Sequence, residues 1–155
     1  MGCHIVVARS ETDMQRNIIL AGVGGQGILT IAQAISLSAM RRGWSVKQAE
    51  VHGMSQRGGA VYSHLRYADQ PVYSDLIPLG ECDLILAMEP LEALRYVEYL
   101  RPSGRIIASC APVVNIPNYP AIEGVLDQVS SYGEHLIVEA DRLARQPGVR
   151  LSHPV

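Results

Sequence analysis

The stretch that decides the fold is Asn17-Ile18-Ile19-Leu20-Ala21, followed at once by Gly22-Val23-Gly24-Gly25-Gln26-Gly27. The first five residues predict a short β-strand, and the next six fit the pattern G-x-G-x-x-G. From position 28 onward, apolar residues recur at helical spacing up to a pair of arginines and Gly43, where a helix is expected to end. Ser45–Glu50 then predicts a second strand. Together these elements form a β-α-β unit of about 30 residues, which is expected to be right-handed.

The rest of the chain continues to alternate strands with helices. A continuous apolar run at 83–88 predicts a strand buried on both faces, and Glu89-Pro90 is expected to open a helix through residue 99. The segments 60–67 and 72–74 flank a turn and predict an antiparallel hairpin, in which His64 and Arg66 share a face that borders solvent. Further strands are predicted at 105–109 and 135–140, and further helices at 121–131 and from 141. This order predicts an α/β fold: a doubly wound, mostly parallel, Rossmann-like sheet with an antiparallel hairpin addition.

The domain is expected to cover residues 17–146. Residues 1–16 lack the features of a secretory signal and are interpreted as a flexible N-terminal arm, with Met14 as an alternative start. Residues 147–155 are interpreted as an irregular tail, either truncated or foreign to the domain. The length of 155 residues suits a single domain with a sizeable core.

Composition excludes several classes of function. A formal net charge of −2 gives no electrostatic reason to expect nucleic acid or an anionic membrane as partner. No apolar run approaches the ~20 residues needed to cross a bilayer. The three cysteines, Cys3, Cys82 and Cys110, are widely spaced, which argues against a disulfide framework, a zinc site and an iron–sulfur site. The expected protein is cytoplasmic, with reduced thiols and no metal of its own.

The glycine turn is the first candidate site. Gly22, Gly24, Gly25 and Gly27, together with Gln26, lie between a strand and a helix, where backbone N–H groups and the helix dipole favour an anion. Glu50 ends the second strand, and its separation along the sequence from the glycine turn suits a carboxylate that binds a ribose hydroxyl. The alternative, glycines that make the turn and bind nothing, stays open.

The second candidate is the loop after the second strand, Glu50-Val51-His52-Gly53-Met54-Ser55-Gln56-Arg57-Gly58-Gly59. It gathers polar groups at the carboxyl end of a parallel strand, where α/β proteins form ligand sites. Arg57 is able to hold a carboxylate or phosphate with two hydrogen bonds, and His52 is able to move a proton. Glu89 follows another strand and could join this site, although a carboxylate at a helix start needs no further explanation. The candidate ligand or interface residues in this part of the chain are Glu50, His52, Gly53, Met54, Gln56, Arg57, Gly58, Gly59 and Glu89; no catalytic residue is assigned.

These two segments, with Tyr73-Ser74-Asp75-Leu76-Ile77-Pro78 and the run 86–95, resemble the gamma-type domain of 2-oxoacid:ferredoxin oxidoreductases. Within that family the chain is similar to the beta subunit of indolepyruvate:ferredoxin oxidoreductase. The resemblance covers about residues 17–144, and its most specific part is the run H-G-M-x-Q-R-G-G at 52–59.

The resemblance implies a subunit that is inactive alone. In the complex, an aryl 2-oxoacid is oxidatively decarboxylated to an acyl-CoA, with electrons passing to ferredoxin. Thiamine diphosphate and iron–sulfur clusters are implied on a larger partner subunit, with CoA as co-substrate and no cofactor on this chain alone. Self-association of the isolated chain stays open. The rival hypotheses are a stand-alone NAD(P)-dependent oxidoreductase that uses Gly22–Gly27 and Glu50, and a non-catalytic nucleotide-binding module.

Overall fold

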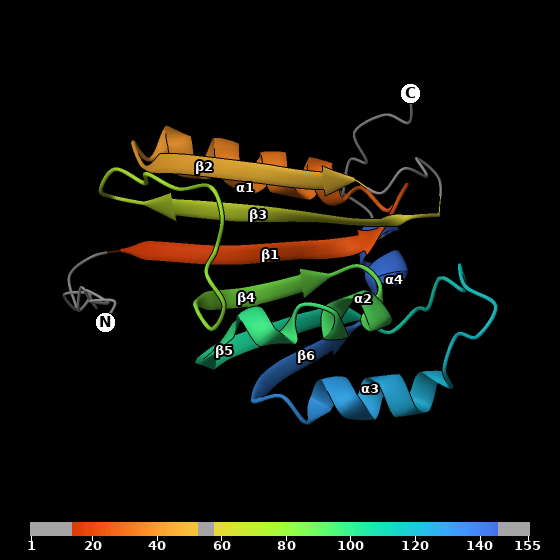
Figure 1. Cartoon of the computed structure of the whole chain (residues 1–155). Helices are drawn as coiled ribbons and strands as arrows, with labels where there is room; N and C mark the ends of the chain where they lie inside the picture. Colours follow the sequence, from red (N-terminus) through yellow and green to blue (C-terminus); the bar gives the residue numbers. More distant parts are fainter. Residues whose placement is uncertain (1–13, 53–57, 146–155) are drawn as a thin grey trace.

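The computed structural model describes residues 14–52 and 58–145 of the chain. In that part, six strands form one sheet in the order β2-β3-β1-β4-β5-β6 (Figure 1). The strands are β1 (Gln15–Val23), β2 (Ser45–His52), β3 (Ala60–Ala68), β4 (Cys82–Ala87), β5 (Leu100–Ser109) and β6 (Glu134–Val138). The helices are α1 (Ile28–Arg41), α2 (Pro90–Leu94), α3 (Ile122–Ser130) and α4 (Ala140–Ala144), with a 3-10 turn η1 (Val97–Tyr99). The expected α/β fold with a mostly parallel sheet is confirmed.

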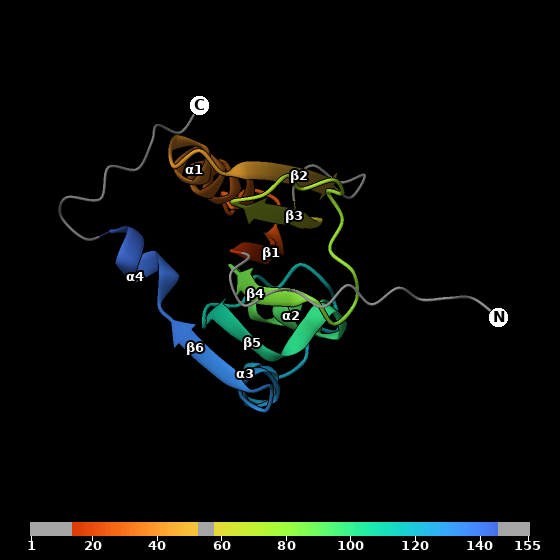
Figure 2. The ribbon, with the colours of Figure 1, turned by 90° about the vertical axis from the view of Figure 1, so that its left-hand side faces the viewer.

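Two apolar clusters lie on opposite faces of the sheet. On one face α1 packs through Ile28 and Ala32 against Ile18 and Leu20 of β1. On the other face, the core includes Ile19 and Ala21 of the same strand together with residues of α2 and α3. Figure 2 shows α1 and α3 on opposite sides of the sheet. Because β1 is buried on both faces, its uninterrupted apolar sequence follows directly from its central position.

The end of α1 is built as the sequence predicts. Gly43 has a φ of 77°, in the left-handed region, and its N–H donates to the carbonyl of Met40 at 2.9 Å. The next N–H, from Trp44, donates to the carbonyl of Ala39 at 3.2 Å. This pair of bonds is a Schellman motif, which satisfies the last carbonyls of the helix and turns the chain toward β2.

The sheet contains the expected antiparallel strand β3, but the predicted pairing of 60–67 with 72–74 is wrong. β3 pairs antiparallel with β2 on one side and with β1 on the other, and it does not pair with residues 72–74. Because both edges of β3 are already occupied, the segment after it has no free edge to join. It crosses over the sheet instead, where Val72 is buried and its N–H donates to the Ser45 hydroxyl at 3.1 Å.

The observed helix α2 is shorter than the helix predicted over 90–99, and the observed strand β5 is longer than the strand predicted over 105–109. α2 ends at Leu94, and the following turn directs Tyr96 onto Tyr62 of β3, with ring centroids 4.7 Å apart. β5 begins at Leu100, which pairs with Cys82 of β4, and the register then shifts so that Leu84 pairs with Arg105. Gly104 permits this shift, since a Cβ atom there would lie 2.8 Å from the carbonyl oxygen of Cys82.

Candidate functional site

The glycine turn crosses from the end of β1 into α1, and two of its glycines require their residue type. Gly25 and Gly27 have φ angles of 100° and 78°, in the region that strains other residues. Gly22 is different, because it lies inside β1 and a Cβ atom there would meet Gln26 Oε1 and Ile28 Cδ1, each at 2.8 Å. Glycine is therefore required by backbone conformation at Gly25 and Gly27, and by close packing at Gly22.

Gln26, predicted as a ligand candidate, is used inside the protein. Its Oε1 accepts the N–H of Val23 at 2.7 Å, and its Nε2 donates to the carbonyl of Met88 at 2.9 Å. The side chain thus joins the end of β1 to the segment that follows β4. It holds the turn in one shape without needing a ligand.

The structure brings the end of the second candidate segment against the glycine turn. The N–H of Gly24 donates to the carbonyl of Gly59 at 2.9 Å, and the carbonyl of Gly58 accepts from Asn115 Nδ2 at 2.8 Å. His52 is the last residue of β2 and pairs with Val61 of β3. Four of the predicted residues lie outside the described part of the chain: Gly53, Met54, Gln56 and Arg57.

Glu50 does not lie where a dinucleotide ribose would need it. Its exposed side chain accepts from Gln48 Nε2 at 2.6 Å, on the edge strand β2. β3 lies between β2 and β1, so Glu50 is displaced from the glycine turn by two strand spacings, about 10 Å. In a dinucleotide-binding unit the strand carrying this carboxylate lies next to the first strand. This geometry argues against the NAD(P) hypothesis.

Glu89 is buried, with an exposed fraction of 1%. Its Oε2 accepts the N–H of Glu92 at 2.8 Å, which caps α2. Its Oε1 accepts the Val113 N–H at 3.4 Å and a short hydrogen bond from the Tyr119 hydroxyl. Burial, with this contact to Glu89 as the next cause, raises the pKa of Tyr119, so the phenol keeps its proton and donates. Glu89 therefore lies at the site edge but has both oxygens occupied by its own chain.

Two cavities open beside the glycine turn. One, of about 360 Å³, is lined by the turn, the first turn of α1 and Val61 of β3. The other, of about 800 Å³, lies on the opposite side of the turn and extends to Met88, Ser109 and α4. No lysine or arginine of the described residues lines either cavity, and the carboxylate of Asp141 lines the larger one. An anion would therefore be favoured only by the start of α1 and the backbone of the glycine turn, which line the smaller cavity.

His64 does not border solvent as predicted, and Arg66 is half-buried. His64 is 3% exposed, and its Nδ1 accepts the Ile77 N–H at 3.2 Å. Burial lowers the pKa of His64, which keeps the ring neutral and able to accept this bond. Arg66 donates to the carbonyls of Ser74 and Leu76 at 3.1 and 2.8 Å. Both side chains fasten the segment that crosses the sheet after β3.

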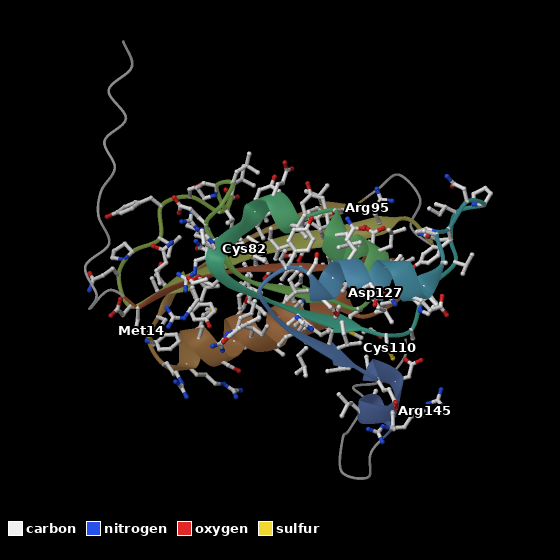
Figure 3. All side chains as sticks on the ribbon, turned by 90° about the horizontal axis from the view of Figure 1, so that it is seen from below. Met14, Cys82, Arg95, Cys110, Asp127 and Arg145 are labelled. Atoms are coloured by element: carbon white, nitrogen blue, oxygen red, sulfur yellow. The ribbon has the colours of Figure 1, made fainter. Side chains whose placement is uncertain are left out.

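The described cysteines are far apart. Cys82 begins β4 and Cys110 follows the end of β5, at opposite ends of the sheet (Figure 3). Burial raises the pKa of Cys82 to about 11, so its thiol is protonated and unreactive at neutral pH. Within residues 14–52 and 58–145, no three histidine, cysteine or acidic side chains gather to hold a metal ion, and no helix is both long and apolar enough to span a membrane.

Comparison with known proteins places this arrangement in a family. Residues 17–154 match the family described as pyruvate ferredoxin/flavodoxin oxidoreductase. The chain belongs to this family. Among curated members, it is 39% identical over 140 residues to the indolepyruvate oxidoreductase subunit IorB of Pyrococcus horikoshii, covering 85% of this chain and 69% of that protein. The corresponding subunit of Archaeoglobus fulgidus is 37% identical over 142 residues, covering 87% of this chain and 70% of that protein.

Solved structures of other oxidoreductase subunits share the fold. The pyruvate oxidoreductase subunit PORC of Thermotoga maritima matches 84% of this chain with a TM-score of 0.60 and 20% identity; the chain spans 65% of that subunit. The 2-oxoglutarate:ferredoxin oxidoreductase of Magnetococcus marinus matches 84% of this chain with a TM-score of 0.63 and 16% identity, over 21% of that longer chain. The six-strand sheet is thus a fold that these oxidoreductases share.

The sequence predicted candidate residues at this edge of the sheet, but it did not single out two residues that contact them. Asn115 and Tyr119 lie in the proline-rich segment 112–120, which the sequence marks only as a loop. Their contacts join segments 57 and 30 residues away along the chain. No local pattern signals such contacts.

Proposed function

We propose that this chain is the small subunit of a 2-oxoacid:ferredoxin oxidoreductase that acts on indolepyruvate or a related aryl pyruvate. The observation that carries the proposal is the 39% identity to an indolepyruvate oxidoreductase subunit across 85% of the chain. The complex would decarboxylate the oxoacid, transfer the acyl group to CoA and pass two electrons to ferredoxin. The complex would work in the cytoplasm, with this chain bound to a larger catalytic subunit.

The described residues do not fit the redox cofactors of such a complex. An iron–sulfur cluster needs several thiolates within one coordination sphere, whereas Cys82 and Cys110 lie at opposite ends of the sheet. We therefore assign the clusters to the partner subunit, and we propose that thiamine diphosphate is bound there as well. This chain would contribute the edge formed by Gly22–Gly27 and by Gly58 and Gly59, where the partner's active site and the CoA path would meet it.

The test is reconstitution. The purified chain is mixed with the thiamine-diphosphate subunit of its own organism, and ferredoxin reduction is followed with indolepyruvate and CoA. We expect no activity from the chain alone and full activity from the mixture. An active large subunit that gains nothing from this chain, or turnover of NAD by the chain alone, would overturn the proposal.

Arg57 and Gly24 provide the sharper variants. The sequence predicts Arg57 in a polar loop, so we expect Arg57→Ala to reduce the activity of the complex at least tenfold while the melting temperature of the chain changes little. Gly24→Val should reduce activity further, because a branched side chain would occupy space beside the backbone bond to Gly59. Arg41→Ala, at an exposed position at the end of α1, is the matched control.

A further inference from the structure

The connection from β5 to α3, residues 110–121, is anchored at two points on one buried carboxylate. The Val113 N–H and the Tyr119 hydroxyl both donate to Oε1 of Glu89. Glu89 is itself fixed, because its Oε2 caps α2 and its side chain is 1% exposed. The connection is therefore held at both sides of residues 114–118.

Between these two anchors, one side chain reaches the other candidate segment. Asn115 Nδ2 donates to the carbonyl oxygen of Gly58 at 2.8 Å, across 57 positions of sequence. The position of the Asn115 side chain is restricted, since the backbone on either side of it is anchored on Glu89. Gly58 has a φ of 79°, a conformation that other residues adopt only with strain, and this conformation helps set the direction of its carbonyl group.

The neighbouring carbonyl is held from another direction. Gly59 O accepts the Gly24 N–H at 2.9 Å, so two consecutive carbonyl groups are bound by two different segments. One bond comes from the glycine turn and the other from the β5–α3 connection. These bonds hold the backbone of Gly58 and Gly59 where it enters β3, at the edge that the proposed function assigns to the partner subunit.

We propose that Asn115 is a positioning residue for the oxidoreductase reaction: by binding the Gly58 carbonyl it sets the orientation in which the Gly58–Gly59 backbone meets the catalytic subunit. This inference rests on the proposed function. Asn115 itself need not touch substrate. Small errors in the placement of active-site parts reduce turnover strongly even when binding is retained.

The experiment compares Asn115→Ala with Asn118→Ala, an exposed asparagine of the same connection. In the reconstituted complex we expect Asn115→Ala to lower kcat about tenfold or more, with a smaller change in KM and with complex formation retained. Asn115→Asp should not restore turnover, because a carboxylate cannot donate to a carbonyl. Asn115→Gln, which keeps the donor, should restore part of it. A loss of kcat no larger than that of Asn118→Ala, or full rescue by Asn115→Asp, would overturn the inference.

A second measurement on the full chain alone separates this inference from the proposed function. Loss of the Asn115 bond should loosen Gly59, so amide hydrogen exchange at Gly24 should accelerate severalfold in Asn115→Ala and not in Asn118→Ala. Unchanged exchange at Gly24 would also count against the role of Asn115. If the wild-type complex never reduces ferredoxin, the proposed function fails. If the wild-type complex is active and Asn115→Ala is equally active, only the positioning role fails.

Discussion

Two strands that lie side by side, β1 and β4, each lead into a helix at the same edge of the sheet, and the two helix starts are built in opposite ways. α1 begins after Gly27, a left-handed residue with no side-chain cap. α2 begins after Glu89, whose buried carboxylate accepts the Glu92 N–H. The start of α1 opens onto a cavity of about 360 Å³, whereas the cap of α2 is closed over by Tyr119 and Val113.

The difference shows which of two similar features is available to a ligand or a partner. The first N–H groups of any helix lack partners within the helix and must find them elsewhere. At α2 a carboxylate of the same chain supplies one, so that site is consumed by the fold. At α1 glycines leave the helix start open. Gln26 links the two, since it binds Val23 of the open turn and Met88 beside the closed one.

Glu89→Ala should break the closed start and have the largest effect on stability. The substitution removes the acceptor of the buried Glu92 N–H and of the partly buried Tyr119 hydroxyl. Each unsatisfied group costs about 1–3 kcal/mol, so we expect a loss of about 3–5 kcal/mol in the free energy of unfolding, measured by urea denaturation.

The matched control is Glu123→Ala, an exposed carboxylate in the first turn of α3. We expect it to change stability by no more than about 0.5 kcal/mol. If both substitutions cost the same, Glu89 is not a buried cap and the contrast between the helix starts disappears.

Gly22→Ala tests the open start from the side of packing. The added methyl group would lie 2.8 Å from Gln26 Oε1 and Ile28 Cδ1. Gln26 is held by two hydrogen bonds and Ile28 is buried. Overpacking of this kind costs about 1–3 kcal/mol, which thermal unfolding would report. Gly124→Ala is the control, because a Cβ atom at this position in the first turn of α3 meets nothing within 4 Å. It should raise stability by roughly 0.5–1 kcal/mol; equal losses at both positions would contradict the packing role of Gly22.

The sequence was sufficient for the elements whose signals are local. The central strand β1, the helix α1 and its end at Gly43 follow from apolar periodicity and from glycine at a left-handed position. The position of β3 could not be predicted in the same way. Its alternating pattern fits a strand with one or two partners, and only the competition among distant strands places it between β2 and β1.

The candidate site divides along the same line. The edge of the sheet and the glycines were predictable, because parallel strands end together and G-x-G-x-x-G marks a turn between strand and helix. The roles of individual polar residues were not. Gln26 and Glu89 looked available for a ligand, and both are bound within the chain by groups more than 20 residues away. A carboxylate in a sequence carries no mark of whether a distant hydroxyl will reach it.

Gln26→Glu should weaken the link between the two helix starts at a smaller cost. Glutamate keeps the oxygen that accepts from Val23 but loses the N–H that donates to Met88, and it places a carboxylate against that carbonyl oxygen. We expect a loss of about 1–2 kcal/mol in urea denaturation. Gln33→Glu, at an exposed position of α1, should be close to neutral. No difference between the two variants would show that the turn keeps its shape without Gln26.

Glu92→Gln should give the smallest effect, and in the opposite direction. Burial raises the pKa of Glu92 from its ordinary value of 4.5, while Arg95 opposes the shift and Glu89 adds to it. One carboxylate oxygen of Glu92 has no hydrogen-bond partner among the described residues. The folded protein therefore binds this proton more tightly than the unfolded chain, and stability is lost as pH rises through the folded pKa. Glutamine does not titrate. The free energy of unfolding of the variant should therefore rise relative to that of the wild type between about pH 4.5 and neutral, and the two should be most similar below pH 4.5. Urea denaturation across this range, with exposed Glu98→Gln as control, measures the difference. If the stability difference between variant and wild type did not change with pH, Glu92 would ionise as readily in the folded protein as in the unfolded one. Burying its charge at the start of α2 would then cost no stability.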